Sequence, residues 1–244
     1  MKETLNTAVN NTKSAIEKPV DGLKITMDNA VENTKYIDGV LKTIDKHNFK
    51  LASHNTMSYL TPKNWIYRLI AFTARCQSKT IYEQIEKYNV ELVDLRFKFN
   101  DKGQVSFAHG AIKYKGGLEI ITEVLEYLNS YENFPVRVLL ENKPGDKDQE
   151  FIAWCKYIEE TYTNIEFFGG RNKWNWDELY KFKNKHPKVL DKYSSCNTNE
   201  PGKPQTGTYL DDLCPILYAK KNNKKNIENG TDKDYLMIDF VEIR

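Results

Sequence analysis

The stretch IYEQIEKYNVELVDLRF, residues 81–97, joins a short helix-like segment to a strand-like one. Apolar residues stand at helical spacing over 81–88, and the run at 91–97 is rich in the branched apolar residues typical of a strand. The same alternation continues along the rest of the chain. It predicts strands at 50–54, 105–109, 136–142, 165–168 and 236–241, helices at 118–131 and 150–162, and weaker strand signals at 189–190 and 216–218.

Strands that alternate with helices predict parallel βα units, which form either an open doubly wound sheet or a closed barrel. No Gly-rich dinucleotide loop or Walker motif follows any of the strands. The length and the number of strand candidates therefore favour an α/β fold, a (β/α)8 TIM-type barrel of irregular form. We expect this barrel to occupy residues 49–244.

Residues 1–48 differ from the rest, being rich in Asn, Thr, Lys and Asp. Apolar residues at helical spacing between about positions 27 and 46 predict a helical N-terminal extension. The alternative is a helix on a membrane surface, which the balanced charges of the segment disfavour. Further on, the lysine- and asparagine-rich run 220–233 predicts a solvated loop, with contact to phosphate or to a membrane as the alternative.

Composition excludes several classes of protein. The 244 residues carry 36 basic and 34 acidic side chains, a net charge of +2, which argues against a nucleic-acid partner. A hydrophobic content of 40% is that of a globular chain. The sequence has neither an apolar run long enough to cross a membrane nor a signal peptide, so we expect a cytoplasmic protein with at most peripheral membrane contact. The four cysteines form no CxxC pair and are expected to be reduced thiols.

Two histidines stand at the ends of predicted strands, His54 in LASHNTMSYL and His109 in VSFAHGAI. Side chains at the carboxyl ends of parallel barrel strands surround one mouth, so these residues can meet although 55 positions separate them. A lone histidine is more often structural. A pair whose pKa values lie near neutrality can act as general base and general acid on one substrate.

Charged residues interrupt three of the apolar strands. Asp94 and Arg96 stand two apart in VDLRF and so point to the same side, Glu141 and Lys143 repeat this spacing, and Asp239 interrupts LMIDFV. Buried charges are costly unless they are paired. The pattern therefore predicts carboxylates at one common mouth, either as a catalytic site or as internal salt bridges that close the barrel.

Four strings in the same order, ASHNT, KTIYEQIEKYNVELVDLRF, VSFAHG and FPVRVLLENK, resemble the X domain of phosphatidylinositol-specific phospholipases C. The second string keeps the Asp-x-Arg of that family but has Asn89 and Glu91 where the family has a glycine and a first arginine. The resemblance covers about residues 50–145 and the last strand around Asp239. Residues 1–48 and 195–235 have no counterpart in it.

The resemblance implies a role for each matching residue. His54 would be the general base on the inositol 2-hydroxyl, and His109 would protonate the departing diacylglycerol oxygen. Asp94 would hold the second strand's side of the site, and Asp239 would orient the first histidine. Arg96 matches the arginine that replaces calcium in bacterial members and neutralises the phosphate. The first product would be a cyclic phosphodiester, and the partner a phospholipid or another phosphodiester.

Metal independence is the expectation that follows from Arg96, because a cation beside a guanidinium would be repelled. The alternative is calcium bound by Asn55, Asp94 and Glu141, which match ligand positions of the calcium-dependent members. Residues expected to contact the substrate are Asn55, Glu141, Lys143 and Arg171. Trp174 and Trp176 would either line the rim of the mouth or pack internally.

Two other functions remain open on the sequence. A glycerophosphodiester phosphodiesterase also has a histidine about 15 positions after a strand carboxylate, but its second acid is a metal ligand, and Arg96 occupies that position here. The other is a catalytically inactive barrel that binds phosphoinositides. A matched base and acid, His54 and His109, argue against a site that only binds.

Overall fold

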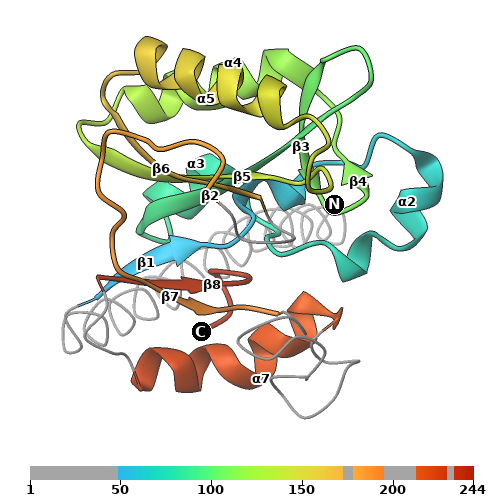
Figure 1. Cartoon of the computed structure of the whole chain (residues 1–244). Helices are drawn as coiled ribbons and strands as arrows, with labels where there is room; N and C mark the ends of the chain where they lie inside the picture. The colour runs from blue at the N-terminus through green and yellow to red at the C-terminus, as the bar shows by residue number, and fades with distance from the viewer. Residues whose placement is uncertain (1–48, 173–177, 195–212, 230–233) are drawn as a thin grey trace, which may run out of the picture. The chain divides into compact units, whose positions relative to one another are not determined.

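The computed structural model describes residues 49–172, 178–194, 213–229 and 234–244 (Figure 1). Six parallel strands form its main sheet in the order β6-β5-β2-β1-β8-β7. Within the described ranges no strand pairing joins β6 to β7, so the sheet does not close into a complete barrel between these two strands. The predicted α/β fold of irregular barrel type is confirmed. The strands are β1 (Lys50–Ser53), β2 (Val90–Phe99), β5 (Phe134–Leu140), β6 (Ile165–Asn172), β7 (Val189–Lys192) and β8 (Tyr235–Ile238).

The predicted helices follow from local signals in the sequence. Helix α3 (Ile81–Glu86) begins with a capping box, in which the side chains of Thr80 and Glu83 each accept from the other's backbone N–H. Helix α4 (Gly117–Asn129) buries four residues at spacings of three and four, and α5 (Asp148–Thr161) buries three. These apolar stripes pack toward the strands. Helices α4 and α5 lie on one side of the sheet, and helix α7 (Pro215–Glu228) lies on the other (Figure 1).

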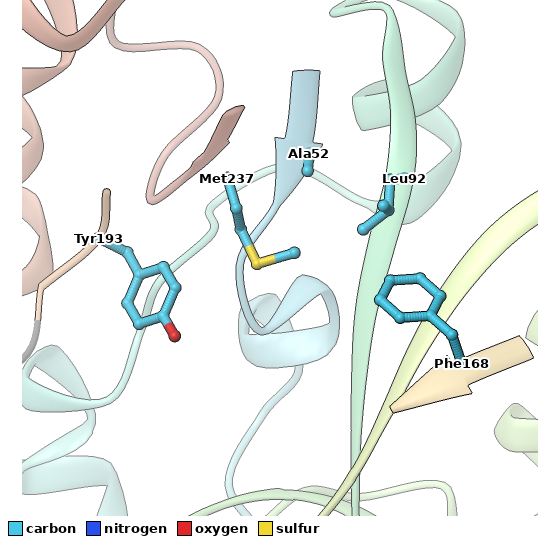
Figure 2. Close-up of a cluster of buried hydrophobic side chains, with 5 residues drawn as sticks. All are labelled: Ala52, Leu92, Phe168, Tyr193 and Met237. Atoms are coloured by element: carbon cyan, nitrogen blue, oxygen red, sulfur yellow. The ribbon is translucent and has the colours of Figure 1, made fainter. Parts of the chain in front are cut away.

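Side chains from β1, β2, β6, β8 and the segment after β7 pack together inside the barrel, below the carboxyl ends of the strands (Figure 2). Because side chains alternate along a strand, residues with the parity of Leu92 and Asp94 on β2 point inward. The apolar residues form a lower layer, and the charged residues form an upper layer nearer the carboxyl ends of the strands. The polar site therefore lies directly on a packed apolar layer. The lower layer consists of Ala52, Leu92, Phe168, Tyr193 and Met237.

Strand β3 (Val105–His109) is antiparallel to β2, with Phe107 opposite Phe97, and forms a hairpin with the short β4 (Ile112–Lys113). The expectation that His109 ends a parallel strand is therefore wrong. The connection at 100–104 is too short for a parallel crossover. It is a tight turn in which Asn100 accepts from the backbone N–H groups of Lys102 and Gln104. His109 nevertheless reaches the mouth, because the hairpin folds back toward it.

Helix α7 (Pro215–Glu228) corrects two further predictions. The strand expected at 216–218 and the loop expected over the first part of 220–233 both lie in this helix. A polar residue, Asn223, occupies the centre of its buried face and donates to the carbonyl oxygens of Asp239 and Ile243. That asparagine interrupts the apolar stripe that would otherwise have indicated a helix.

Short elements that the sequence did not indicate lie between β1 and α3. They are the 3-10 helices η1 (Thr56–Tyr59) and η2 (Ala71–Thr73) and the helix α2 (Trp65–Leu69). In the described part of the chain, every helix is too short or too polar to cross a membrane. The predicted extension at 1–48, Trp174 and Trp176 lie outside the described residues, and the predictions about them stay predictions.

Candidate active site

His54 follows β1 and Asp239 follows β8, the strand beside it. The backbone N–H of His54 donates to the carbonyl of Ile238, so register alone brings the two side chains together. The Nδ1 atom of His54 lies 2.6 Å from Oδ1 of Asp239, and both residues are buried. The ring of Tyr193 stacks on the imidazole with 3.6 Å between centroids and 2° between planes.

The backbone turns sharply after each member of this pair. Asn55 has φ 42° and Phe240 has φ 47°, both in the left-handed region. Asparagine tolerates this conformation, but a bulky residue such as Phe240 adopts it rarely and at a cost of roughly 1–3 kcal/mol. Strain of this kind persists where neighbours hold the chain in place, and the N–H of Phe240 donates to the carbonyl of Cys76.

Burial raises the pKa of Asp239 to about 8, and the Ser194 N–H and the Cys76 thiol only partly offset it. The pair of His54 and Asp239 therefore retains a proton near neutral pH. Because the carboxyl group engages Nδ1, the other ring nitrogen, Nε2, is the one that would exchange a proton with a substrate.

The second imidazole, His109, lies close to the first. The ring centroids of His54 and His109 are 6.1 Å apart, and the planes meet at 89°. Nδ1 of His109 is 2.9 Å from the carbonyl oxygen of Ala74, which can only accept, so this nitrogen carries the hydrogen. The ring is partly exposed, as expected of a group that meets a ligand from solvent. The predicted convergence of the two histidines is thus present in the structure.

A network centred on Arg96 holds the two histidine segments. Its Nε donates to Asp94 over 2.8 Å, and its Nη1 donates to Glu141 over 3.2 Å. Asp94 in turn accepts from the backbone N–H of Asn55, and Glu141 accepts from that of Gly110, each over 2.9 Å. These two N–H groups belong to the residues that directly follow the histidines. One guanidinium therefore connects both sides of the mouth.

Two donors in this network have no hydrogen-bond partner among the described residues. They are Nη2 of Arg96 and Nδ2 of Asn55, and both side chains are at most 3% exposed. Burial alone would lower the pKa of Arg96, but Asp94 and Glu141 outweigh it and hold the pKa above its ordinary value. A buried donor without a partner costs about 1–3 kcal/mol. Donors of this kind bind anions.

Arg137 is a site residue that the sequence reasoning missed. Its Nε donates to Asp94 and its Nη1 to Asp191, each over 2.9 Å, and the guanidinium lies 5.9 Å from the ring centre of Tyr193. A signal existed, because Arg137 has the parity of Glu141 on β5 and therefore points inward. Tyr193 and Cys76 were also missed, and nothing in the sequence around them indicates the site.

No protein-family model matches the sequence, and no curated protein matches it. Among solved structures, the chain is similar to a phosphatidylinositol-specific phospholipase C from Listeria monocytogenes, at 16% identity and a TM-score of 0.49, over 80% of this chain and 89% of that one. A mutant of the corresponding enzyme from Staphylococcus aureus is similar at 15% identity and a TM-score of 0.48, over 80% and 86%. These likenesses carry no statement about chemistry, which has to come from the side chains.

The carboxylates of the calcium alternative do not fit that ion. Both oxygens of Asp94 accept from N–H donors, two of which belong to guanidinium groups. One oxygen of Glu141 accepts from Arg96 and the other from the backbone N–H of Gly110. Calcium requires six to eight oxygen ligands, and here it would have to displace fixed cations. The Asp94 and Glu141 pair is therefore built to hold an arginine.

Of the predicted substrate contacts, Lys143 is not brought to the site, and the prediction for Arg171 stays a prediction. Lys143 is exposed, and no hydrogen bond or ion pair within the described ranges joins its side chain to the mouth. The backbone of Arg171 belongs to β6, but its side chain lies outside the described part of the structure.

Proposed function

We propose that the protein is a phosphodiesterase resembling phosphatidylinositol-specific phospholipase C, which cleaves a phosphodiester by attack of the inositol 2-hydroxyl through a cyclic phosphate. One observation carries this proposal. The rings of His54 and His109 lie 6.1 Å apart, on segments that the buried guanidinium of Arg96 connects. The Nη2 group of this guanidinium has no hydrogen-bond partner among the described residues. A base, an acid and a fixed cation are what this displacement at phosphorus requires.

The proposed reaction divides between the side chains as follows. His54 takes the proton of the attacking hydroxyl at Nε2 while Asp239 holds its Nδ1. Charge grows on the non-bridging oxygens, and the donors proposed to bind them are Nη2 of Arg96 and Nδ2 of Asn55, which have no hydrogen-bond partner among the described residues. His109 gives a proton to the departing oxygen. The fork of a guanidinium suits this arrangement better than an ammonium, because Nε and Nη1 can hold the two carboxylates while Nη2 is left for the phosphate.

Metal independence is part of the proposal, since Arg96 supplies the positive charge that calcium would otherwise provide. We expect hydrolysis of an inositol phosphodiester to proceed unchanged in EDTA. A 31P NMR time course on the full chain should show a cyclic phosphodiester before any ring-opened product. Loss of activity in EDTA with recovery in calcium would refute metal independence. Direct formation of the open monoester, cleavage of glycerophosphodiesters instead, or binding without hydrolysis would each overturn the mechanism.

The substrate is proposed to be a phospholipid met at a membrane surface. Large apolar side chains are exposed along α2 and η2, on the segment that leads to Ala74, whose carbonyl contacts His109. A patch of this kind on a soluble surface marks a binding site. The exposed side chains are Trp65, Ile66, Leu69, Ile70 and Phe72.

We expect the double variant Trp65→Ser with Phe72→Ser to cleave phosphatidylinositol vesicles roughly tenfold or more slowly, because it loses apolar area that would enter the lipid. Cleavage of a soluble inositol phosphodiester should be unchanged. The matched control is Tyr157→Ser, which removes an exposed aromatic ring from α5. Equal rates of the double variant and the control on vesicles would contradict a lipid contact at this segment.

A further inference from the structure

One cluster in the mouth combines three different ligand atoms. His54, Cys76 and Asp239 each offer one ligand atom, and the nitrogen, sulfur and oxygen atoms all lie within 4.8 Å of one another. All three residues are buried. We propose that this trio binds a thiophilic divalent cation, with Zn2+ as the representative ion, and that the bound cation holds the site inactive.

The donor set selects the class of metal. A thiolate, an imidazole and a carboxylate suit Zn2+, which often has three protein ligands and one further position open to water. Calcium and magnesium prefer oxygen ligands alone and would leave the sulfur unused. The cluster therefore differs from the oxygen-only set considered above in both its residues and its metal.

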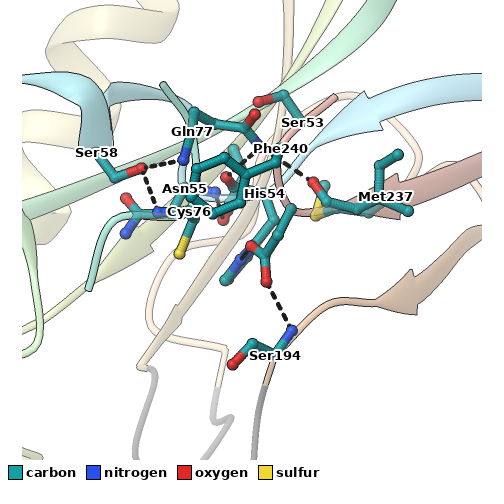
Figure 3. Close-up of polar contacts among 12 residues, drawn as sticks. Ser53, His54, Asn55, Ser58, Cys76, Gln77, Ser194, Met237 and Phe240 are labelled. Atoms are coloured by element: carbon teal, nitrogen blue, oxygen red, sulfur yellow. Dashed lines mark hydrogen bonds and ion pairs between the residues drawn. The ribbon is translucent and has the colours of Figure 1, made fainter. Parts of the chain in front are cut away.

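Surrounding hydrogen bonds fix the backbone that carries the cysteine (Figure 3). The hydroxyl of Ser58 accepts from the N–H groups of Cys76 and Gln77, each over 2.9 Å. The side chain of Gln77 donates to the carbonyls of His54 and Ile238, each over 3.1 Å. The ends of β1 and β8 are thus tied to the segment of Cys76, which prearranges all three ligands.

A carboxylate contact completes the arrangement. The Ser194 N–H donates to Oδ2 of Asp239 over 2.7 Å, and the Cys76 thiol also hydrogen-bonds to this carboxyl group. Oδ1 of Asp239 is directed at His54, so the carboxyl group lies between the other two ligands. A dication in the middle of the cluster would neutralise the buried charge of the thiolate and the carboxylate together.

Proton balance shows why the cation would inhibit. Binding of Zn2+ releases the proton of the Cys76 thiol, and no electron is transferred. The metal takes the place of the proton between Nδ1 of His54 and Asp239, and that proton moves to Nε2 of the same ring. With Nε2 protonated, the histidine can no longer act as a base. The inhibitory consequence rests on the proposed function, but the binding of the metal does not.

Cobalt titration of the full chain tests the site, because a thiolate bound to Co2+ gives a charge-transfer absorption. We expect one equivalent to produce this band and Zn2+ to remove it by displacement. Cys76→Ser should lose the band, whereas Cys155→Ser, which alters a buried thiol on α5, should keep it. Circular dichroism checks that both variants are folded. A missing band in the unchanged protein, or a full band in folded Cys76→Ser, would overturn the proposal.

An activity measurement separates this inference from the proposed function. Zn2+ should inhibit the unchanged enzyme and Cys155→Ser equally, and inhibit Cys76→Ser at least tenfold more weakly relative to that variant's own metal-free rate. Equal inhibition of all three would contradict inhibition through this cluster. A protein that gives the Cys76-dependent band but cleaves no inositol phosphodiester would support the metal site and refute the proposed function.

Discussion

Replacing His109 by alanine should lower turnover of phosphatidylinositol by about 10²–10⁴-fold, the usual contribution of a general acid. The variant should remain folded, because His109 is partly exposed and its contacts, which include the Ala74 carbonyl, the Cys76 thiol and the edge of His54, lie at the mouth and not in the apolar core. His54→Ala should cause a loss of the same order. Steady-state rates together with thermal melts distinguish lost chemistry from lost structure.

The leaving group shows which histidine is the acid. Nitrophenolate departs without a proton, so His109→Ala should lose much less activity on a nitrophenyl inositol phosphodiester than on the lipid. His54→Ala should lose activity equally on both, because the attacking hydroxyl still needs a base. If His109→Ala lost activity equally on the two substrates, its assignment as the acid would be wrong.

His186→Ala is the matched control for both variants. His186 is exposed, and its Nε2 lies 3.7 Å from Glu178, with which it forms a surface ion pair when protonated. Such pairs contribute little to stability. Its rates on both substrates should match those of the unchanged protein. A loss comparable to that of His109→Ala would indicate a general effect of removing an imidazole.

The strands and helices with strong local signals could be predicted, and so could the meeting of the histidines. Strands 50–54 and 236–241 lie next to each other in the sheet, and their parity alone brings His54 to Asp239. The inward charges of β2 also follow from alternation. Their pairing with Glu141 and Arg137 confirms the expectation that buried charges find partners.

The remaining features depend on tertiary contacts that no local pattern carries. The direction of β3 is set by a five-residue turn at 100–104, which a strand pattern does not reveal. The helical state of 215–228 depends on Asn223, whose polar side chain is buried only because three backbone carbonyls face it. The approach of Cys76 to the site likewise results from a loop fixed by Ser58.

Asp94→Asn should lower the free energy of unfolding by roughly 3–5 kcal/mol, the usual cost of removing one partner from a buried ion pair. Asp94 is fully buried and accepts from both Arg96 and Arg137. An amide of the same shape leaves two buried guanidinium groups without their shared counter-charge. Urea unfolding at neutral pH measures the loss. The control is Asp191→Asn, whose carboxylate is 37% exposed and whose one ion pair with a described residue is that with Arg137. It should lose at most about 1 kcal/mol.

The pH dependence provides a second test of the same residue. Burial would raise the pKa of Asp94, but Arg137 and Arg96 outweigh it and hold that pKa well below its ordinary value. The unfolded chain therefore binds a proton near pH 4, while the folded protein still keeps the charge, so this contribution to stability is lost as pH falls. The difference in the free energy of unfolding between the unchanged protein and Asp94→Asn should accordingly have its largest value at pH 7 and shrink below about pH 4. A difference that stayed constant down to pH 3 would mean that the charge of Asp94 does not hold the arginines, and that the mouth is stabilised by packing instead.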